Sequence, residues 1–246
     1  MALNFKLDQG VDERGRLGLI VLSTDETLEN EARHILCGKP VSLLHARIPA
    51  EPDVTPDALR TMEGHMSATA ALLPEGLDAV GYGCTSGATV IGPERVGALI
   101  SGARGARAVS NPLTAVTTAL HALGVKRIAL LTPYVESVNK PLIAALAAAG
   151  IETGPQASFG QSGDWTVARI PEGDVLAAMK MLASSGDCDA VFASCTNLRT
   201  LGILAEAEAA TGVPVVSSNL ALIWHLLRLA RIDARGWVPG RLFALA

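Results

Sequence analysis

The feature that most constrains the fold of this chain is an internal repeat. The pattern Asp-Ala-Val, three further residues and Cys-Thr occurs twice, with its cysteine at Cys84 and at Cys195. These cysteines are 111 residues apart, and the same offset aligns the apolar run 16–22 with the run that begins at Arg127. Self-similarity at one fixed offset indicates a duplicated structural unit. We therefore expect two similar halves within the 246 residues.

Short apolar runs alternate with Ala- and Leu-rich segments of helical period along the chain. Runs that are apolar throughout are typical of strands covered on both faces, and strand-helix alternation predicts a parallel sheet. The strands are predicted at 16–22, 41–48, 77–83, 107–110, 126–132, 152–159, 189–194 and 213–218. The predicted fold class is α/β, with two doubly wound parallel-sheet halves related by a pseudo-two-fold axis.

The repeat also suggests how the chain is divided. A third repeated segment, GARAVSN and GVPVVSSN, recurs at an offset of 107 and supports two units. The predicted parts are an N-terminal extension at 1–15, a first half at 16–120, a second half at 121–218 and a C-terminal tail at 232–246. The helix 219–231 is expected to pack back onto the first half.

Composition narrows the partners of such a chain. A net charge of -4 with scattered basic residues gives no positive stripe for nucleic acid. The apolar runs are too short to cross a bilayer, and the start has no apolar stretch after a basic cap. Four cysteines are too few to suggest a disulfide framework. We expect a cytoplasmic protein with reduced thiols and a small-molecule partner.

The two repeated cysteines are the candidate catalytic residues. Strand ends of two related parallel sheets meet at a shared crevice, where ligands bind in open α/β folds. Cys84 and Cys195 should therefore face each other there. Two thiols on either side of one carbon can remove a proton from one face and return one to the other, or one thiolate can add to the carbon. A lone buried cysteine is usually only a small apolar residue, but core packing gives no reason to repeat its polar successor.

The residues after each cysteine suggest an anion site. Thr85 and Ser86 follow Cys84 and enter a helix, and Thr196 and Asn197 follow Cys195 in the same way. Backbone N–H groups at a helix N-terminus favour a carboxylate and should lower the thiol pKa. The five histidines show no metal spacing, and the glycines of GYGCTSG do not form a dinucleotide fingerprint. We expect neither a metal nor a cofactor.

A resemblance to a known superfamily rests on five segments, which read GLIVLSTDETLE, VGYGCTSGATVIG, RIALLTPYVESVN, SCTNLRT and GVPVVSSNLALIWHLLRLA. From about Arg16 to Leu229 the chain resembles the aspartate/glutamate racemase superfamily, in the branch of maleate cis-trans isomerases and arylmalonate decarboxylases. It also resembles racemase-like proteins associated with ectoine utilisation, which would connect it with ectoine degradation. The resemblance implies a two-half α/β fold and catalysis without a cofactor.

The resemblance assigns roles by position. It makes Cys84 the nucleophile of maleate isomerases and Cys195 the proton donor. The hydroxyls that cradle a substrate carboxylate correspond to Thr85, Ser86 and Tyr134. Tyr134 also lies opposite Ser23 in the repeat. Arylmalonate decarboxylases carry glycine where Cys84 stands here, which favours two-thiol chemistry over decarboxylation.

The end of the first strand departs from the family pattern. Maleate isomerases read Pro-Ser-Ser-Asn there, whereas this chain reads Leu-Ser-Thr-Asp, ending at Asp25. A carboxylate would repel a second substrate carboxylate and attract an ammonium. Asp25 could equally be a turn or helix-cap residue. The residues predicted to bind substrate are Ser23, Asp25, Thr85, Ser86, Tyr134, Thr196 and Asn197.

The sequence thus predicts a cofactor-independent two-cysteine isomerase of a small carboxylic or amino acid, either a racemase or epimerase or a maleate-type cis-trans isomerase. One alternative is an arylmalonate-type decarboxylase with Cys195 as proton donor. Another is a non-catalytic protein that binds a small acid. A homo-oligomer is expected.

Overall fold

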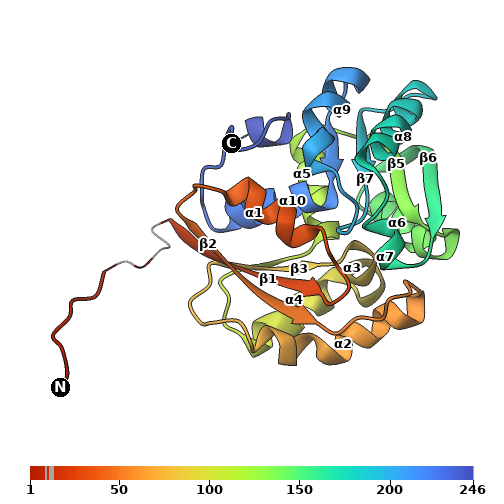
Figure 1. Cartoon of the computed structure of the whole chain (residues 1–246). Helices are drawn as coiled ribbons and strands as arrows, with labels where there is room; N and C mark the ends of the chain where they lie inside the picture. The colour runs from red at the N-terminus through yellow and green to blue at the C-terminus, as the bar shows by residue number, and fades with distance from the viewer. Residues whose placement is uncertain (9, 11–13, 246) are drawn as a thin grey trace.

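The structure is a computed structural model that describes residues 1–8, 10 and 14–245, and it contains two parallel sheets of four strands each (Figure 1). The first sheet contains β1 (Gly15–Leu22), β2 (Val41–Ile48), β3 (Ala79–Gly83) and β4 (Val109–Ser110). The second contains β5 (Arg127–Tyr134), β6 (Glu152–Gln161), β7 (Ala190–Ala193) and β8 (Val215–Ser217). Their orders are β2-β1-β3-β4 and β6-β5-β7-β8, so the second half repeats the topology of the first. The predicted α/β class with two similar sheets is confirmed.

Helices cover both faces of the sheets. In Figure 1, α1 and α10 lie on one face of the first sheet, and α2 and α4 on the other. The helices of the first half are α1 (Leu28–Leu36), α2 (Pro56–Ala70), α3 (Thr85–Ile91), α4 (Pro93–Ala103) and α5 (Pro112–Ala122). Those that follow are α6 (Glu136–Ala148), α7 (Asp164–Val167), α8 (Glu172–Ser184), the 3-10 turn η1 (Leu201–Ile203), α9 (Leu204–Thr211), α10 (Ser218–Leu229) and the 3-10 turn η2 (Leu242–Ala244).

The last long helix returns to the first half. α10 packs against β3, β4 and α5, and it also contacts β8, from which it emerges. Its side chains from Leu220 to Trp224 are all buried, because the helix is covered on several sides. A helix that is apolar around most of its circumference is stable only when it is enclosed in this way. α10 thus ties the two sheets together.

The central strands place both cysteines at one edge. β1 pairs with β3 up to Val21 and Gly83, and β5 pairs with β7 up to Leu131 and Ala193. These strands are buried along nearly their whole length, which explains their continuous apolar runs. Because the strands are parallel, Cys84 and Cys195 follow them at the carboxyl ends.

Two parts of the sequence prediction meet the limits of the structure. β1 begins at Gly15, and residues 9 and 11–13 of the predicted extension lie outside the described residues, as does 246 of the predicted tail. In the part of the chain that the structure describes, no helix is both long and apolar enough to cross a membrane.

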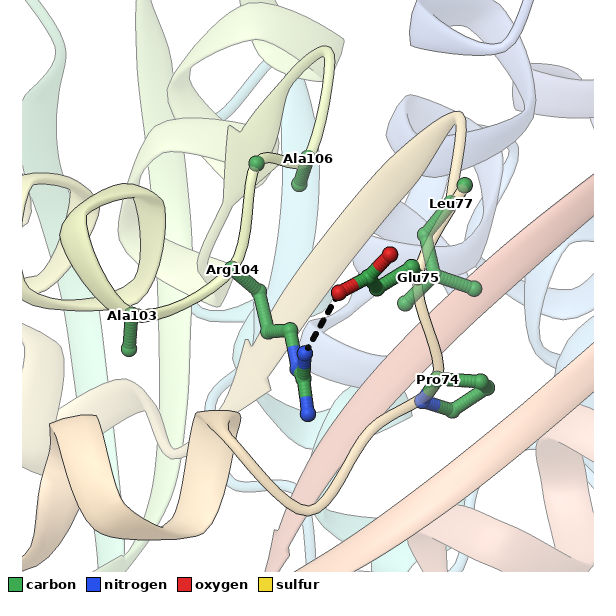
Figure 2. Close-up of a pocket in the computed structure, with 8 residues that line it drawn as sticks. Pro74, Glu75, Leu77, Ala103, Arg104 and Ala106 are labelled. Carbon is green, nitrogen blue, oxygen red and sulfur yellow. Dashed lines mark hydrogen bonds and ion pairs between the residues drawn. The ribbon is translucent and has the colours of Figure 1, made fainter.

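A surface hollow lies at the amino end of β3, away from the cysteines (Figure 2). It is formed by the loops 74–77 and 103–106. Arg104 forms an ion pair with Glu75 at 3.4 Å there, at the surface. The carboxyl edge of the sheets, with both cysteines, is therefore the stronger candidate site.

Candidate active site

Both repeated cysteines line one small enclosed cavity between the two halves. The residues that line it are Leu22, Asp25, Val54, Leu59, Cys84, Thr85, Ser86, Tyr134, Asp164, Cys195, Thr196 and Asn197. Its volume of about 10 Å³ is enough for about one water molecule. In this conformation the cavity is too small to hold an organic acid.

Cys84 is the N-cap residue of α3. Its Sγ accepts a hydrogen bond from the Gly87 N–H at 3.2 Å. A Cβ on Gly87 would lie 2.4 Å from the Tyr82 hydroxyl and 3.1 Å from this sulfur, so glycine permits the close approach. Burial raises the pKa of Cys84 to about 12, and the Gly87 N–H lowers it only in part. The expectation of a lowered thiol pKa is wrong for this closed cavity, because desolvation outweighs the helix N-terminus.

Cys195 belongs to a different hydrogen-bond network. Its Sγ accepts from the Asn197 N–H at 3.3 Å and lies 3.2 Å from the Tyr134 hydroxyl. The same hydroxyl donates to Asp164 Oδ1 at 2.9 Å. A phenol has one hydrogen, so when Tyr134 donates to Asp164 the Cys195 thiol must be the donor to Tyr134. Burial raises the pKa of Cys195 well above its usual value. Burial and the charge of Asp164 thus favour the protonated thiol, although the hydrogen bonds from Tyr134 and Asn197 lower its pKa in part.

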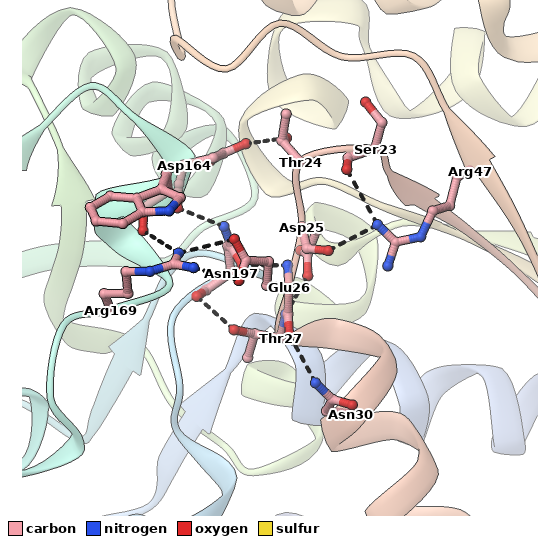
Figure 3. Close-up of polar contacts among 11 residues, drawn as sticks. Ser23, Thr24, Asp25, Glu26, Thr27, Asn30, Arg47, Asp164, Arg169 and Asn197 are labelled. Atoms are coloured by element: carbon pink, nitrogen blue, oxygen red, sulfur yellow. Dashed lines mark hydrogen bonds and ion pairs between the residues drawn. The ribbon is translucent and has the colours of Figure 1, made fainter.

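Asp164 is a site residue that the sequence analysis missed. It opens α7, is 3% exposed, and accepts from the Thr24 hydroxyl at 2.5 Å (Figure 3). It also accepts from the Tyr134 hydroxyl. Desolvation by burial raises its pKa. The signal was present in the repeat, since an offset of 111 aligns Asp53-Val54-Thr55 with Asp164-Trp165-Thr166.

The two aligned loops join across the cavity. Asp53 and Gly163 form an antiparallel bridge, with the Val54 N–H donating to Ser162 O at 2.7 Å and the Asp164 N–H donating to Pro52 O at 3.0 Å. These bonds cross from the first half to the second. We call these two loops the strap loops; Val54 and Asp164, which line the cavity, belong to them.

The two carboxylate oxygens of Asp25 have different surroundings, and only one of them accepts hydrogen bonds from the backbone (Figure 3). Oδ1 accepts from the N–H groups of Thr27 and Leu28 at 2.8 Å each, which caps the start of α1. Oδ2 is buried and has no hydrogen-bond partner among the described residues. The N–H groups of Leu28 and Thr27 and, to a smaller extent, the Thr196 side chain lower the pKa of Asp25. Burial is the larger effect and raises this pKa to about 6.

The other predicted site residues are used in different ways. Thr85 lines the cavity and donates to the Ser218 hydroxyl at 2.8 Å. Ser86 also lines it, and its hydroxyl has no partner within the described part of the chain. Ser23 is exposed and its Oγ accepts from the Ala50 N–H at 3.0 Å, so it does not line the cavity.

Thr196 and Asn197 line the cavity from a turn. No α-helix begins directly after Cys195 in the described segment 195–200; the chain turns and continues into η1, so the predicted second helix N-terminus is wrong. The Asn197 amide accepts from the Glu26 N–H and donates to Asp164 O, both at 2.9 Å (Figure 3). Its side chain therefore holds the two halves together.

This fold and site define a class of α/β proteins with two related sheets and a cysteine from each half in one cavity. The sequence profile of the arylmalonate decarboxylase family matches residues 17–243. The chain belongs to this family.

Individual relatives carry two named activities. Arylmalonate decarboxylase of Bordetella bronchiseptica is 38% identical over 132 residues, which is 53% of this chain and 55% of that one. Maleate isomerase of Nocardia farcinica is 27% identical over 92% of this chain and 93% of its own length. A cysteine-to-serine variant of the Nocardia farcinica maleate cis-trans isomerase, solved with a covalently bound succinylcysteine intermediate, superposes with a TM-score of 0.80 over 93% of this chain and 98% of that chain at 27% identity.

Proposed function

We propose that this protein is a cofactor-independent isomerase that uses Cys84 and Cys195 as an acid-base pair on one small carboxylic acid. The observation that carries the proposal is that both thiols line one cavity, each at the end of an equivalent strand. The succinylcysteine intermediate of the Nocardia farcinica enzyme supports cysteine chemistry in this fold.

Racemisation or epimerisation needs a proton to leave one face of a carbon and another to arrive on the opposite face. One cysteine, as thiolate, takes the α-hydrogen as a proton, and the electron pair moves into the carboxylate to give an enediolate. The thiol of the other cysteine then gives its proton to the opposite face, which leaves that cysteine as the thiolate. The reverse reaction uses the two residues in exchanged roles.

Cis-trans isomerisation of a maleate-type substrate is the other form of this function. The Cys84 thiolate would add to one alkene carbon while the Cys195 thiol protonates its neighbour. Rotation about the resulting single bond and the reverse elimination give the trans product. The 27% identity with the Nocardia farcinica maleate isomerase over nearly the whole chain supports cis-trans isomerisation as a form of the proposed function.

An arylmalonate-type decarboxylase is the second candidate, supported by the 38% identity with the Bordetella bronchiseptica enzyme over about half the chain. Loss of carbon dioxide is helped by an apolar pocket around the departing carboxylate. Here Asp25 and Asp164 line the cavity instead, which counts against it. A non-catalytic acid-binding protein would not require two thiols in one cavity.

A proton-exchange screen in deuterated water tests the proposed function. NMR would follow amino acids, N-acylated diamino acids, maleate and malonates with the purified protein. We expect deuterium at the reacting carbon together with inversion or cis-trans conversion, dependent on both cysteines. Release of carbon dioxide that persists in Cys84→Ser would favour the decarboxylase, and no reaction with any of these acids would favour a binding protein.

We also infer that the enzyme works in the cytoplasm as a homo-oligomer. The four cysteines are unpaired, which supports a reducing compartment. Light scattering coupled to size-exclusion chromatography would report the assembly.

A further inference from the structure

We propose that the cavity between the cysteines binds the ammonium group of a monocarboxylic α-amino acid, with Asp25 Oδ2 as its acceptor and Asp164 as a second negative charge beside it. The inference rests on the proposed function and names its substrate class. It is carried by the unpartnered oxygen of Asp25, by the charges that line the cavity and by the groups left for a carboxylate.

The Asp25 oxygen is a built acceptor without a donor. Asp25 is 2% exposed and lines the cavity, and Oδ2 has no hydrogen-bond partner in the described part of the chain. A buried carboxylate oxygen left unpaired is costly, so such an atom indicates a missing donor. The capping role of Asp25 needs only Oδ1, because both N–H groups of the cap donate to that oxygen. The cap therefore leaves the second oxygen of this cavity-lining residue unexplained.

The cavity has negative groups and no positive one. Its lining contains Asp25 and Asp164, and none of the described residues that line it is Lys, Arg or His. Arg47 is near but donates to the backbone oxygens of Leu22, Ser23 and Asp25 rather than to the carboxylate (Figure 3). A cationic group of the ligand is the charge that would balance the site.

The remaining free groups define the other end of the ligand. The Ser86 hydroxyl lines the cavity and has no partner among the described residues, so it can donate to one carboxylate. A second carboxylate would have to lie near Asp25 and Asp164, which repel it. One carboxylate and one ammonium on the carbon between the thiols describe an α-amino acid with an uncharged side chain.

The charge of such a ligand would also act on the thiols. After burial, the charges of Asp164 and Asp25 are among the causes that raise the pKa of Cys84. An ammonium between them offsets both charges and so lowers that pKa. The substrate itself would then help to form the Cys84 thiolate, which burial disfavours.

Matched pairs of acids that differ in the amino group test this site. NMR titrations of the full chain at pH 7.5 would compare alanine with propionate, 2-aminobutyrate with butyrate and aspartate with succinate. We expect alanine and 2-aminobutyrate to bind on the order of 100-fold more tightly than propionate and butyrate. Aspartate should bind more weakly than 2-aminobutyrate, because its second carboxylate meets the acidic wall.

Variants separate the ammonium site from the cap. Asp25→Asn keeps an oxygen for the Thr27 and Leu28 N–H groups and should reduce the preference for amino acids to less than about tenfold. Asp164→Asn should weaken it by a smaller factor. Glu136→Gln is the matched control, because Glu136 is the equivalent residue in the repeat and its side chain is 80% exposed. It should leave the preference unchanged.

The dependence on pH gives a second measurement. The acceptor must be ionised, and the pKa of Asp25 is about 6, so amino-acid affinity should fall about tenfold per pH unit below 6. The other titratable groups that face Asp25 in the cavity are Asp164, Cys84, Cys195 and Tyr134. Burial raises the pKa of each of them, so the two thiols and the phenol stay neutral over this range.

The outcomes distinguish the two proposals. Equal affinity within each pair, or an unchanged preference in Asp25→Asn with its fold intact, overturns the ammonium site. If a deaminated acid binds better and is isomerised by both cysteines, the ammonium site is wrong and the isomerase stands. If amino acids alone bind and their α-hydrogens never exchange, the ammonium site stands and the isomerase is wrong.

Discussion

The two halves share a backbone plan but direct different side chains into the cavity. Ser23 and Tyr134 are equivalent in the repeat, yet Ser23 is exposed and Tyr134 is 7% exposed and contacts Cys195. Asp53 and Asp164 are equivalent too, and only Asp164 is buried. The second half therefore supplies the polar network around its cysteine, and the first half turns the matching residues to solvent.

In one equivalent pair, the residue of the first half is the buried one. Asp25 is 2% exposed and faces the cavity, whereas its equivalent Glu136 has a side chain that is 80% exposed and forms an ion pair with Lys140. Duplication thus placed the thiols symmetrically, while the groups that control them became unequal. The two cysteines therefore have different surroundings, although they end equivalent strands.

The segments after the cysteines differ for a physical reason. Cys84 begins α3, whose first N–H groups lie at the cavity. After Cys195, the N–H groups of Thr200 and Leu201 donate to the carboxylate of Glu31 at 2.7 and 2.8 Å. Glu31 comes from α1 in the first half and is buried. The carboxylate of Glu31 thus binds the N–H groups at the start of η1, and this segment connects the second half to the first.

The largest expected effect is loss of one thiol. Cys84→Ser and Cys195→Ser should each lower isomerisation by roughly 10³- to 10⁴-fold, because a hydroxyl is a much weaker acid-base group. In a racemase each variant should still exchange the α-hydrogen of one enantiomer, and the two variants should prefer opposite enantiomers. NMR in deuterated water measures this. Full activity in Cys84→Ser would contradict two-thiol chemistry.

A mass measurement sharpens the same comparison. If the reaction is cis-trans isomerisation, the Cys195→Ser variant should accumulate an adduct on Cys84 equal in mass to the substrate, since release needs the missing thiol. The wild-type protein serves as the control. An adduct on Cys195 in the Cys84→Ser variant instead would reverse the assigned roles.

Tyr134→Phe should have the next largest effect on turnover. It removes the hydroxyl that contacts Cys195 and donates to Asp164, and loss of one such positioned group costs on the order of 100-fold in kcat. Ser23→Ala tests the equivalent position and should change kcat far less, because Ser23 is exposed. Steady-state kinetics on the identified substrate decide it, and similar losses in both variants would contradict the inequality of the halves.

Glu31→Ala should reduce stability more than chemistry. The substitution leaves the N–H groups of Thr200 and Leu201 and the Asn219 amide without their acceptor. Breaking such a buried network costs about 3 to 5 kcal/mol of unfolding free energy. Urea unfolding measures it, with Glu26→Ala, an exposed acid nearby, as control. A loss below about 1 kcal/mol would show that the capped end of η1 contributes little.

Asp25→Asn should have the smallest effect on stability, with the opposite sign. The pKa of Asp25 is raised from 3.8 to about 6 in the folded state, so the fold prefers the protonated form. The contribution of Asp25 to the free energy of unfolding is therefore largest below pH 4. It falls by at most about 3 kcal/mol as the pH rises through the folded-state pKa of about 6.

Asparagine removes that dependence. Thermal unfolding of Asp25→Asn at pH 8 should give a higher midpoint than the wild type, and the gain should vanish toward pH 4. Glu136→Gln at the exposed equivalent position should change neither midpoint. A less stable Asp25→Asn at pH 8 would mean that the cap outweighs the burial of charge.

Much of the fold follows from local pattern. Continuous apolar runs and helical segments at a repeated spacing predict two parallel sheets, and the repeat places Cys84 and Cys195 at equivalent strand ends. The ends of the strands follow less directly from the sequence, since β4 and β8 are shorter than the apolar runs that predict them. Backbone periodicity is a property of neighbouring residues, so a sequence reveals it directly.

The division of roles between the halves depends on tertiary structure. Burial of Tyr134 and exposure of Ser23, or of Asp164 and Asp53, is decided by how the strap loops from distant segments pack. The sequence showed that the two cysteines are equivalent. Only the packed structure gives them unequal neighbours and raised pKa values, because desolvation and hydrogen bonding depend on residues far away in the chain.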